Sequence, residues 1–231
     1  MIALSAAEWE VILLSVQVSL TAIGLCLPLA YLLAWLLARR FAGRLLLDAV
    51  VHLPLVLPPV VTGWLLLIML GPQGFAGAWL KETFGITLVF RFAGAALAAA
   101  VMALPLMVRA IRISIENVDR RLVGAARTLG CGPWRAFATI TLPLSLPGIL
   151  AGAVLGFARS LGEFGATITF ASSIPGETRT LPLAIYSGLQ VPGMEGAVAR
   201  LAVISVLLSL AALLASEVLI RRSGARNLHV L

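Results

Sequence analysis

Residues 11–37 read VILLSVQVSLTAIGLCLPLAYLLAWLL, and this stretch contains no charged residue. A helix needs about 20 consecutive apolar residues to cross the hydrocarbon core of a bilayer. The stretch exceeds that length, so it is predicted to be a transmembrane helix. Because lipid offers no hydrogen-bonding partner to an open backbone, the rest of the chain is also expected to cross the membrane as helices.

The whole chain has the composition of an integral membrane protein. Of its 231 residues, 61% are hydrophobic and 12% are charged, and its mean hydropathy is +1.05. A soluble domain of this size carries about 25% charged residues. These values exclude the soluble, disordered, collagen-like and disulfide-scaffold classes. Residues 1–231 are therefore expected to form a single all-α transmembrane domain.

Further apolar stretches predict four more transmembrane helices, which makes five in all. They cover residues 49–70, 92–108, 144–158 and 201–216. The stretch from residue 92 extends back to residue 86 if Arg91 is admitted, and the last one runs on to residue 220. The stretch from residue 144 continues to residue 171 if Arg159 and Glu163 are admitted.

Two local features modify this count. Pro58 and Pro59 lie inside the second span, where prolines break or kink a helix. Residues 180–191 form a sixth apolar segment of about twelve residues, which is too short to cross a bilayer. We therefore expect this segment to be re-entrant or interfacial.

The positive charges distinguish the two sides of the membrane. Cytoplasmic loops carry an excess of Lys and Arg. If the N-terminus is periplasmic and the C-terminus cytoplasmic, Lys81, Arg91, Arg179 and Arg200 lie outside. The arginines that then lie inside are Arg39, Arg40, Arg44, Arg109, Arg112, Arg120, Arg121, Arg127, Arg135, Arg221, Arg222 and Arg226. This bias predicts a periplasmic N-terminus and a cytoplasmic C-terminus. The net charge of +7 therefore follows the membrane topology, and no nucleic-acid partner is needed to explain it.

The longest polar loop, about residues 116–143, is predicted to contain a short amphipathic helix. A helix can start at Asn117-Val118-Asp119, because a side-chain oxygen there can accept hydrogen bonds from free backbone N–H groups. An apolar stripe follows, and glycines at positions 130 and 132 end it. The stripe consists of Leu122, Ala125, Ala126 and Leu129. Such a helix lies either on the membrane surface or in a groove of a partner protein.

The same loop resembles the EAA loop of binding-protein-dependent ABC importer permeases. The matching residues are Gly124, Ala125, Ala126, Arg127, Thr128, Leu129 and Gly130, followed nine residues later by Ile140, Thr141, Leu142 and Pro143. The resemblance implies that residues 124–130 form the coupling helix that docks into an ATPase subunit. The acidic residue that usually stands near Ala-Ala is absent, so docking must rely on shape and on other contacts.

Three further segments resemble the molybdate permease subgroup: residues 52–61, 158–167 and 174–180. The resemblance implies a type I (MetI-like) importer fold in a bacterial inner membrane, and ATP-driven import of molybdate. The segment around residue 160 is shared with sulfate-type relatives, so a sulfate or tungstate permease is the alternative. The implied partners are two ATPase subunits that use ATP and Mg²⁺, a periplasmic oxyanion-binding protein and a second permease copy in a homodimer.

The chain is not expected to be an enzyme or to hold a cofactor or metal of its own. A P-loop needs a lysine followed by Ser or Thr, whereas the one lysine, Lys81, precedes Glu82. Two histidines cannot build a three-histidine zinc site. A secondary transporter or channel is a less favoured interpretation, because no inverted repeat is evident. A membrane scaffold without transport is a third.

The fourth span carries two charges that are expected to face one another. Arg159 and Glu163 are four residues apart on this span, so they are expected to share one face of the helix. They form either a structural ion pair or a border of the translocation path, where Thr167 could add a hydroxyl donor. Gly148, Gly152 and Gly156 form a row of small residues that allows close helix packing, within one chain or across a dimer.

Overall fold

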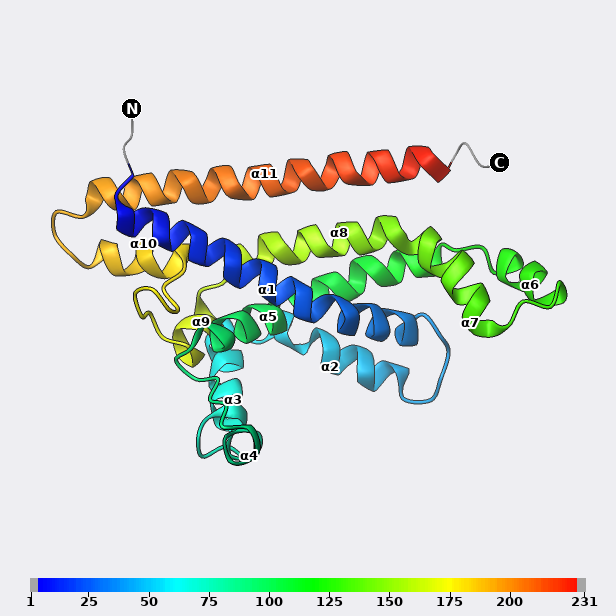
Figure 1. The fold of residues 1–231 in the computed structure, drawn as a ribbon, viewed down its shortest axis with the longest axis horizontal. Coiled ribbons are helices and arrows are strands. Elements are labelled where there is room, and N and C mark those ends of the chain that lie inside the picture. The colour runs from blue at the N-terminus through cyan, green and yellow to red at the C-terminus, as the bar shows by residue number, and fades with distance from the viewer. Residues whose placement is uncertain (1–3, 228–231) are drawn as a thin grey trace.

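The computed structural model describes residues 4–227, and within that range the chain forms helices and loops but no strand (Figure 1). The helices in chain order are α1 (Ala6–Leu37), α2 (Arg44–Val56), α3 (Pro59–Leu70), α4 (Phe75–Phe84), α5 (Phe92–Glu116), α6 (Arg120–Thr128), α7 (Pro133–Ala136), the π-helical turn η1 (Phe137–Thr141), α8 (Leu142–Leu161), α9 (Gly165–Phe170), α10 (Leu181–Leu189) and α11 (Glu195–Asn227).

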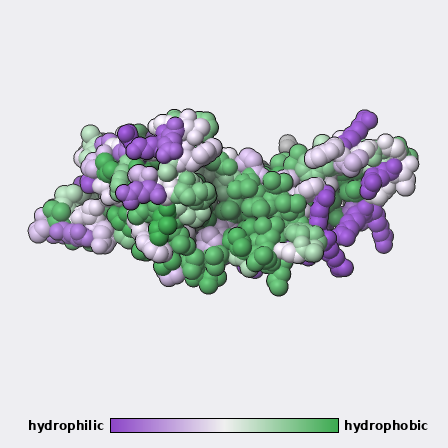
Figure 2. All heavy atoms as spheres, turned by 90° about the horizontal axis from the view of Figure 1, so that it is seen from below, coloured by the Kyte–Doolittle hydropathy of each residue, from purple (hydrophilic) through white to green (hydrophobic). Residues whose placement is uncertain are grey.

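Four helices of the described part are long and apolar enough to cross a membrane, and a bent pair makes up to five. The four are α1, α5, the run from α7 through α8, and α11, which lie lengthwise in Figure 1. The bent pair is α2 and α3. Figure 2 shows hydrophilic residues gathered toward the two ends of the molecule and apolar residues between them. This confirms the predicted all-α membrane protein, and the predicted five spans are reached if the bent pair counts as one span.

The second span is broken where the prolines predict it. Helix α2 ends at Val56, Leu57 and Pro58 are extended, and α3 begins at Pro59. The two helices meet at 115°. Two adjacent prolines remove two successive backbone donors, and their rings crowd the preceding turn, which favours a break at this point. Figure 1 shows α3 turned away from the lengthwise helices, with α4 at its far end.

The fourth span is shorter than the sequence pattern predicts. Helix α8 ends at Leu161, and the chain turns through Gly162 and Glu163 before α9 begins. Continuation of one helix to residue 171 is therefore wrong. The Glu163 carboxylate accepts a hydrogen bond from the Ala166 backbone N–H at 2.9 Å, which compensates for the interrupted helical ladder. Thr167 lies in α9, where it is buried, and not on α8.

The row of small residues on α8 packs against other helices of the same chain. A Cβ added at Gly148 would collide with the Cβ of Ser114 on α5. A Cβ added at Gly156 would lie 2.7 Å from the sulfur of Met107. Where the row continues, Ser160 donates a hydrogen bond to Ser19 of α1 at 3.1 Å. This seam lies within the chain, which resolves the two alternatives left by the sequence.

The short segment after residue 180 forms α10, which is too short to cross the bilayer, as expected. The backbone N–H of Leu181 donates to the Ser15 hydroxyl of α1 at 2.7 Å in a buried contact. A second link joins the same part of α1 to α11, because Arg200 forms an ion pair with Glu8 at 2.7 Å. These contacts hold α10 and α11 against the beginning of α1.

We predict that Gly148→Ala lowers the stability of the protein by about 1–3 kcal/mol, the usual cost of inserting atoms into a packed core. The added methyl group meets a Cβ that the α5 backbone fixes in place. Gly24→Ala is the matched control, because a Cβ at Gly24 in α1 meets nothing within 4 Å. Thermal unfolding in detergent should show a lower midpoint for Gly148→Ala only. Equal unfolding midpoints for both variants would contradict close packing of α8 against α5 at Gly148.

Candidate functional site

The loop between α5 and α8 forms the short helix that the sequence predicts, with both ends defined by hydrogen bonds. Asp119 accepts from the Arg121 backbone N–H at 2.8 Å, which caps the N-terminus of α6. At the other end Gly130 adopts a left-handed φ of +83°. The Cys131 N–H bonds to the Ala126 carbonyl at 2.9 Å, as in a Schellman cap. A side chain at position 130 is therefore strained whatever the space around it.

The apolar stripe of α6 is uncovered in the chain. Within α6, which the structure describes in full, no residue is buried. Leu122 is 47% exposed, and Leu129, just after the helix, is 88% exposed. Figure 1 shows α6 and α7 at one end of the molecule, beyond the ends of α1 and α2. The arrangement presents apolar side chains together with arginines to whatever covers this end.

An aromatic cluster fixes this loop to the helix bundle. The ring of Phe137 in η1 makes edge contacts with Tyr31 and Trp35 of α1 at centroid distances of 5.9 Å, and with Trp134 at 6.3 Å. Each such pair contributes about 0.5–1.5 kcal/mol beyond its buried area. Sequence reasoning noted the loop's apolar stripe but missed this cluster. The four-residue spacing of Tyr31 and Trp35 on one face of α1 is the signal that was available.

An ionic network joins α2 to α5 toward the same end of the molecule. Arg112 contacts Asp48 at 3.1 Å and Glu116 at 2.9 Å, and Arg44 contacts Glu116 at 3.4 Å. His52 lies against Asp48, with its Nδ1 3.2 Å from the carboxylate. The sequence reasoning did not find this network, although the spacings of Asp48 to His52 and of Arg112 to Glu116 place each pair on one helix face.

The structure brings Arg159 and Glu163 together even though Glu163 lies past the end of α8. Arg159 Nη1 and Glu163 Oε2 are 2.6 Å apart. The Glu163 side chain is 2% exposed and the Arg159 side chain 26% exposed. Glu163 Oε2 has no further hydrogen-bonding partner among the described residues. The carboxylate is thus held by Arg159 and by the Ala166 N–H, while the guanidinium keeps one side accessible.

The backbone around this pair packs tightly against the broken second span. A Cβ added at Gly165 would lie 2.7 Å from Pro59, and one at Gly63 would lie 2.7 Å from the Ala166 carbonyl oxygen. The two interruptions, after α2 and after α8, therefore meet in space. Nearby on α3, Thr62 is buried and its hydroxyl has no partner among the described residues. The pair and the residues of α6 lie in separate parts of the molecule (Figure 1).

Comparison with known proteins places these features in a wider group. The family described as "Binding-protein-dependent transport system inner membrane component" matches residues 27–224. The molybdenum transport system permease protein ModB of Escherichia coli K12 is 60% identical over 220 residues, covering 95% of this chain and 96% of the relative. The protein of the same name from Haemophilus influenzae is 57% identical, covering 93% and 94%.

A solved structure supports the fold. A chain of a bacterial ABC transporter involved in the import of the acidic polysaccharide alginate superposes with a TM-score of 0.74. The identity is 19%, and the match covers 95% of this chain and 80% of that chain. At this identity the likeness concerns the fold alone. It shows the type I importer permease architecture that the sequence predicts.

We predict that Arg159→Leu lowers stability by about 3–5 kcal/mol, because it leaves a buried carboxylate without its countercharge. The double variant Arg159→Leu/Glu163→Gln should be less destabilised, since glutamine carries no charge and its oxygen can still accept from the Ala166 N–H. Unfolding of the three proteins in detergent measures the difference. A double variant that is as unstable as Arg159→Leu would show that the pairing is not what stabilises this turn.

Proposed function

The chain belongs to the family of binding-protein-dependent transport system inner membrane components, and from that premise we propose that it is the membrane-spanning permease subunit of an ATP-driven importer of molybdate. The observation that supports molybdate as the substrate is the 60% identity to a molybdenum transport permease over 95% of the chain. The chain is a transport subunit and not an enzyme, as its relatives are transport permeases.

The proposed complex contains two ATPase subunits, a periplasmic oxyanion-binding protein and a second copy of this chain. The end that carries α6 is assigned to the cytosol by the arginine bias of the sequence. The N-terminus is then periplasmic and the C-terminus cytoplasmic. The exposed stripe of α6 supports ATPase docking, because a helix with apolar side chains on one face fits a groove of a partner. We therefore propose that this helix docks into a partner protein and does not lie on the membrane surface.

In the proposed mechanism, α8 transmits the movement of the ATPase subunits to the helix bundle. Helix α7, η1 and α8 follow one another without a break, from Pro133 to Leu161. Closure of the ATPases on ATP displaces α6, and the contacts of Phe137 pass that displacement to α1 and to the start of α8. Because α8 packs closely on α5, it moves with α5 as a unit and does not bend separately. The pore then alternates between outward and inward access.

Arg159 is proposed to border the anion path with Glu163 as its positioning residue. A lone positive charge within a membrane is costly, and the buried carboxylate lowers that cost. The guanidinium remains partly exposed, so it can offer hydrogen bonds to a passing oxyanion. Thr167 is buried beside this turn and is proposed to support the wall of the path. Such weak contacts suffice for a pore, because the binding protein selects the substrate.

The coupling role of α6 is tested by a pair of glycine variants. Gly130→Ala forces a side chain into a left-handed backbone at the end of α6, so we expect ATP-dependent transport in proteoliposomes to fall at least tenfold, the effect of about 1.4 kcal/mol. Gly132→Ala is the matched control, because Gly132 has a φ of −63° and an added Cβ meets nothing. Equal transport by both variants would contradict the role of this turn.

The path is tested with the neutral double variant Arg159→Leu/Glu163→Gln. We expect this variant to assemble with the ATPase subunits and to hydrolyse ATP, but to transport molybdate at least tenfold more slowly, a change of about 1.4 kcal/mol in the barrier. Uptake of molybdate, tungstate and sulfate is measured in proteoliposomes that contain the complex and the binding protein. Normal uptake by the double variant would show that Arg159 and Glu163 have a structural role only. Uptake of sulfate alone would overturn the proposed substrate.

A further inference from the structure

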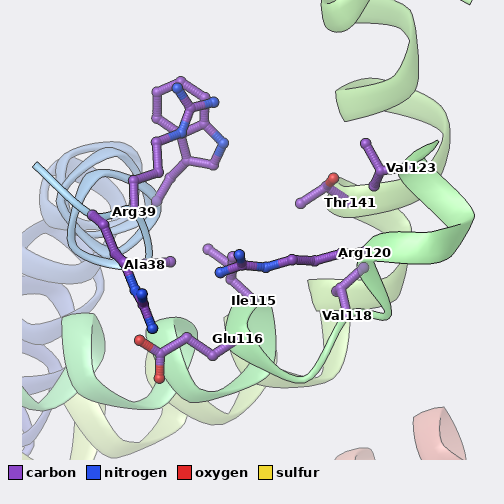
Figure 3. Close-up of a pocket in the computed structure, with 10 residues that line it drawn as sticks. Ala38, Arg39, Ile115, Glu116, Val118, Arg120, Val123 and Thr141 are labelled. Carbon is purple, nitrogen blue, oxygen red and sulfur yellow. The ribbon is translucent and has the colours of Figure 1, made fainter. Parts of the chain in front are cut away.

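A pocket of about 330 Å³ lies behind the coupling helix, between the end of α1, the end of α5 and η1. Its walls combine arginines with apolar side chains and one tryptophan. Figure 3 shows Arg120 reaching from α6 across the pocket, with Ile115 and Glu116 of α5 on one side and Ala38, just after α1, on another. The pocket therefore lies where the coupling helix α6 meets the ends of α1 and α5.

The charge of this pocket is positive and only partly compensated. The guanidinium of Arg39 stacks over the Trp35 ring, 3.4 Å from its centroid. Among residues 4–227, neither Arg40 nor Arg120 forms an ion pair. The carboxylate that lines the pocket, Glu116, is already engaged by Arg44 and Arg112.

The pocket lies on the side of α6 that faces away from the apolar stripe. Successive residues of an α-helix are about 100° apart around its axis, so Leu122 and Leu129 lie roughly opposite Arg120. Arg120 and Val123, one turn apart, both line the pocket. A ligand in the pocket and an ATPase on the stripe would therefore occupy opposite faces of the same helix. Changes at Arg120 can thus be separated from changes in docking.

We propose that this pocket binds the phosphate headgroup of an anionic phospholipid. Basic pockets between transmembrane helices on the cytoplasmic side are suited to such headgroups. Trp35 lies next to the arginines near the end of a span, the level at which indole rings border the headgroup region. On the same face of α1, one turn earlier, Leu32 is 50% exposed and offers an apolar surface to an acyl chain.

The bound headgroup would join the end of α1 to the coupling helix. Its phosphate would accept hydrogen bonds from Arg40 and Arg120, which belong to the two different elements. The lipid thereby restrains α6 relative to the bundle and strengthens the transmission of ATPase closure. This inference rests on the proposed function only in placing this end of the molecule at the cytosolic leaflet.

The direct test is titration of the purified full chain in uncharged detergent with a fluorescent phosphatidylglycerol, compared with the matching phosphatidylcholine. We expect phosphatidylglycerol to bind, and Arg40→Gln/Arg120→Gln to bind it at least tenfold more weakly, because both proposed donors to the phosphate are then without charge. Arg121→Gln/Arg135→Gln removes the same charge outside the pocket and should bind normally. Arg40→Lys/Arg120→Lys should restore most of the affinity.

Equal affinity of the unchanged chain for the two lipids would overturn the proposal without reference to any variant. So would equal weakening by the two glutamine pairs, which would indicate a diffuse surface charge. Displacement of the lipid by millimolar inorganic phosphate or molybdate would also overturn it, because the site would then take a free oxyanion. The titration uses neither ATPase nor transport, so its outcome is independent of whether the chain imports molybdate.

Discussion

The close packing of α8 against α5 is the contact on which the remaining structure depends. Glycines at positions 148, 152 and 156 let the two helices approach closely, and at position 148 an added methyl group would collide with Ser114 of the facing helix. Helix α8 starts where the coupling loop ends and finishes at the turn that holds Arg159 against Glu163. One helix thus connects the surface proposed to dock an ATPase with the charged turn proposed to border the path.

The two ends of α8 satisfy opposite requirements. In the loop before α8, on the side proposed to be cytosolic, apolar side chains such as Leu129 stay exposed, as on a surface that a partner covers. At the other end, a carboxylate is buried and must find both a cation and a backbone donor. The missing acidic residue of the coupling motif leaves α6 with arginines and small side chains. Shape and cationic contacts are therefore expected to dominate the proposed docking surface.

Much of the fold was predictable because its signals are local. Hydropathy gives the spans, Pro58 and Pro59 give the break, and the stretches 117–119 and 130–133 bracket α6. The end of α8 at Leu161 was not predictable, since it depends on Glu163 bonding to the Ala166 N–H in place of the helical ladder. The aromatic cluster at Phe137 and the Asp48–Arg112–Glu116 network join residues far apart in sequence. Periodicity cannot reveal such contacts, and it cannot say whether a glycine row packs within one chain.

The most direct test of the central claim is photo-crosslinking from the coupling helix in the assembled complex in native membranes. A benzoylphenylalanine at position 129, where Leu129 is 88% exposed, should crosslink to the ATPase subunit. The same group at position 191, in the loop between α10 and α11 at the opposite end of the molecule (Figure 1), should not. Crosslinks from position 129 to lipid alone, or to a periplasmic protein, would contradict the account.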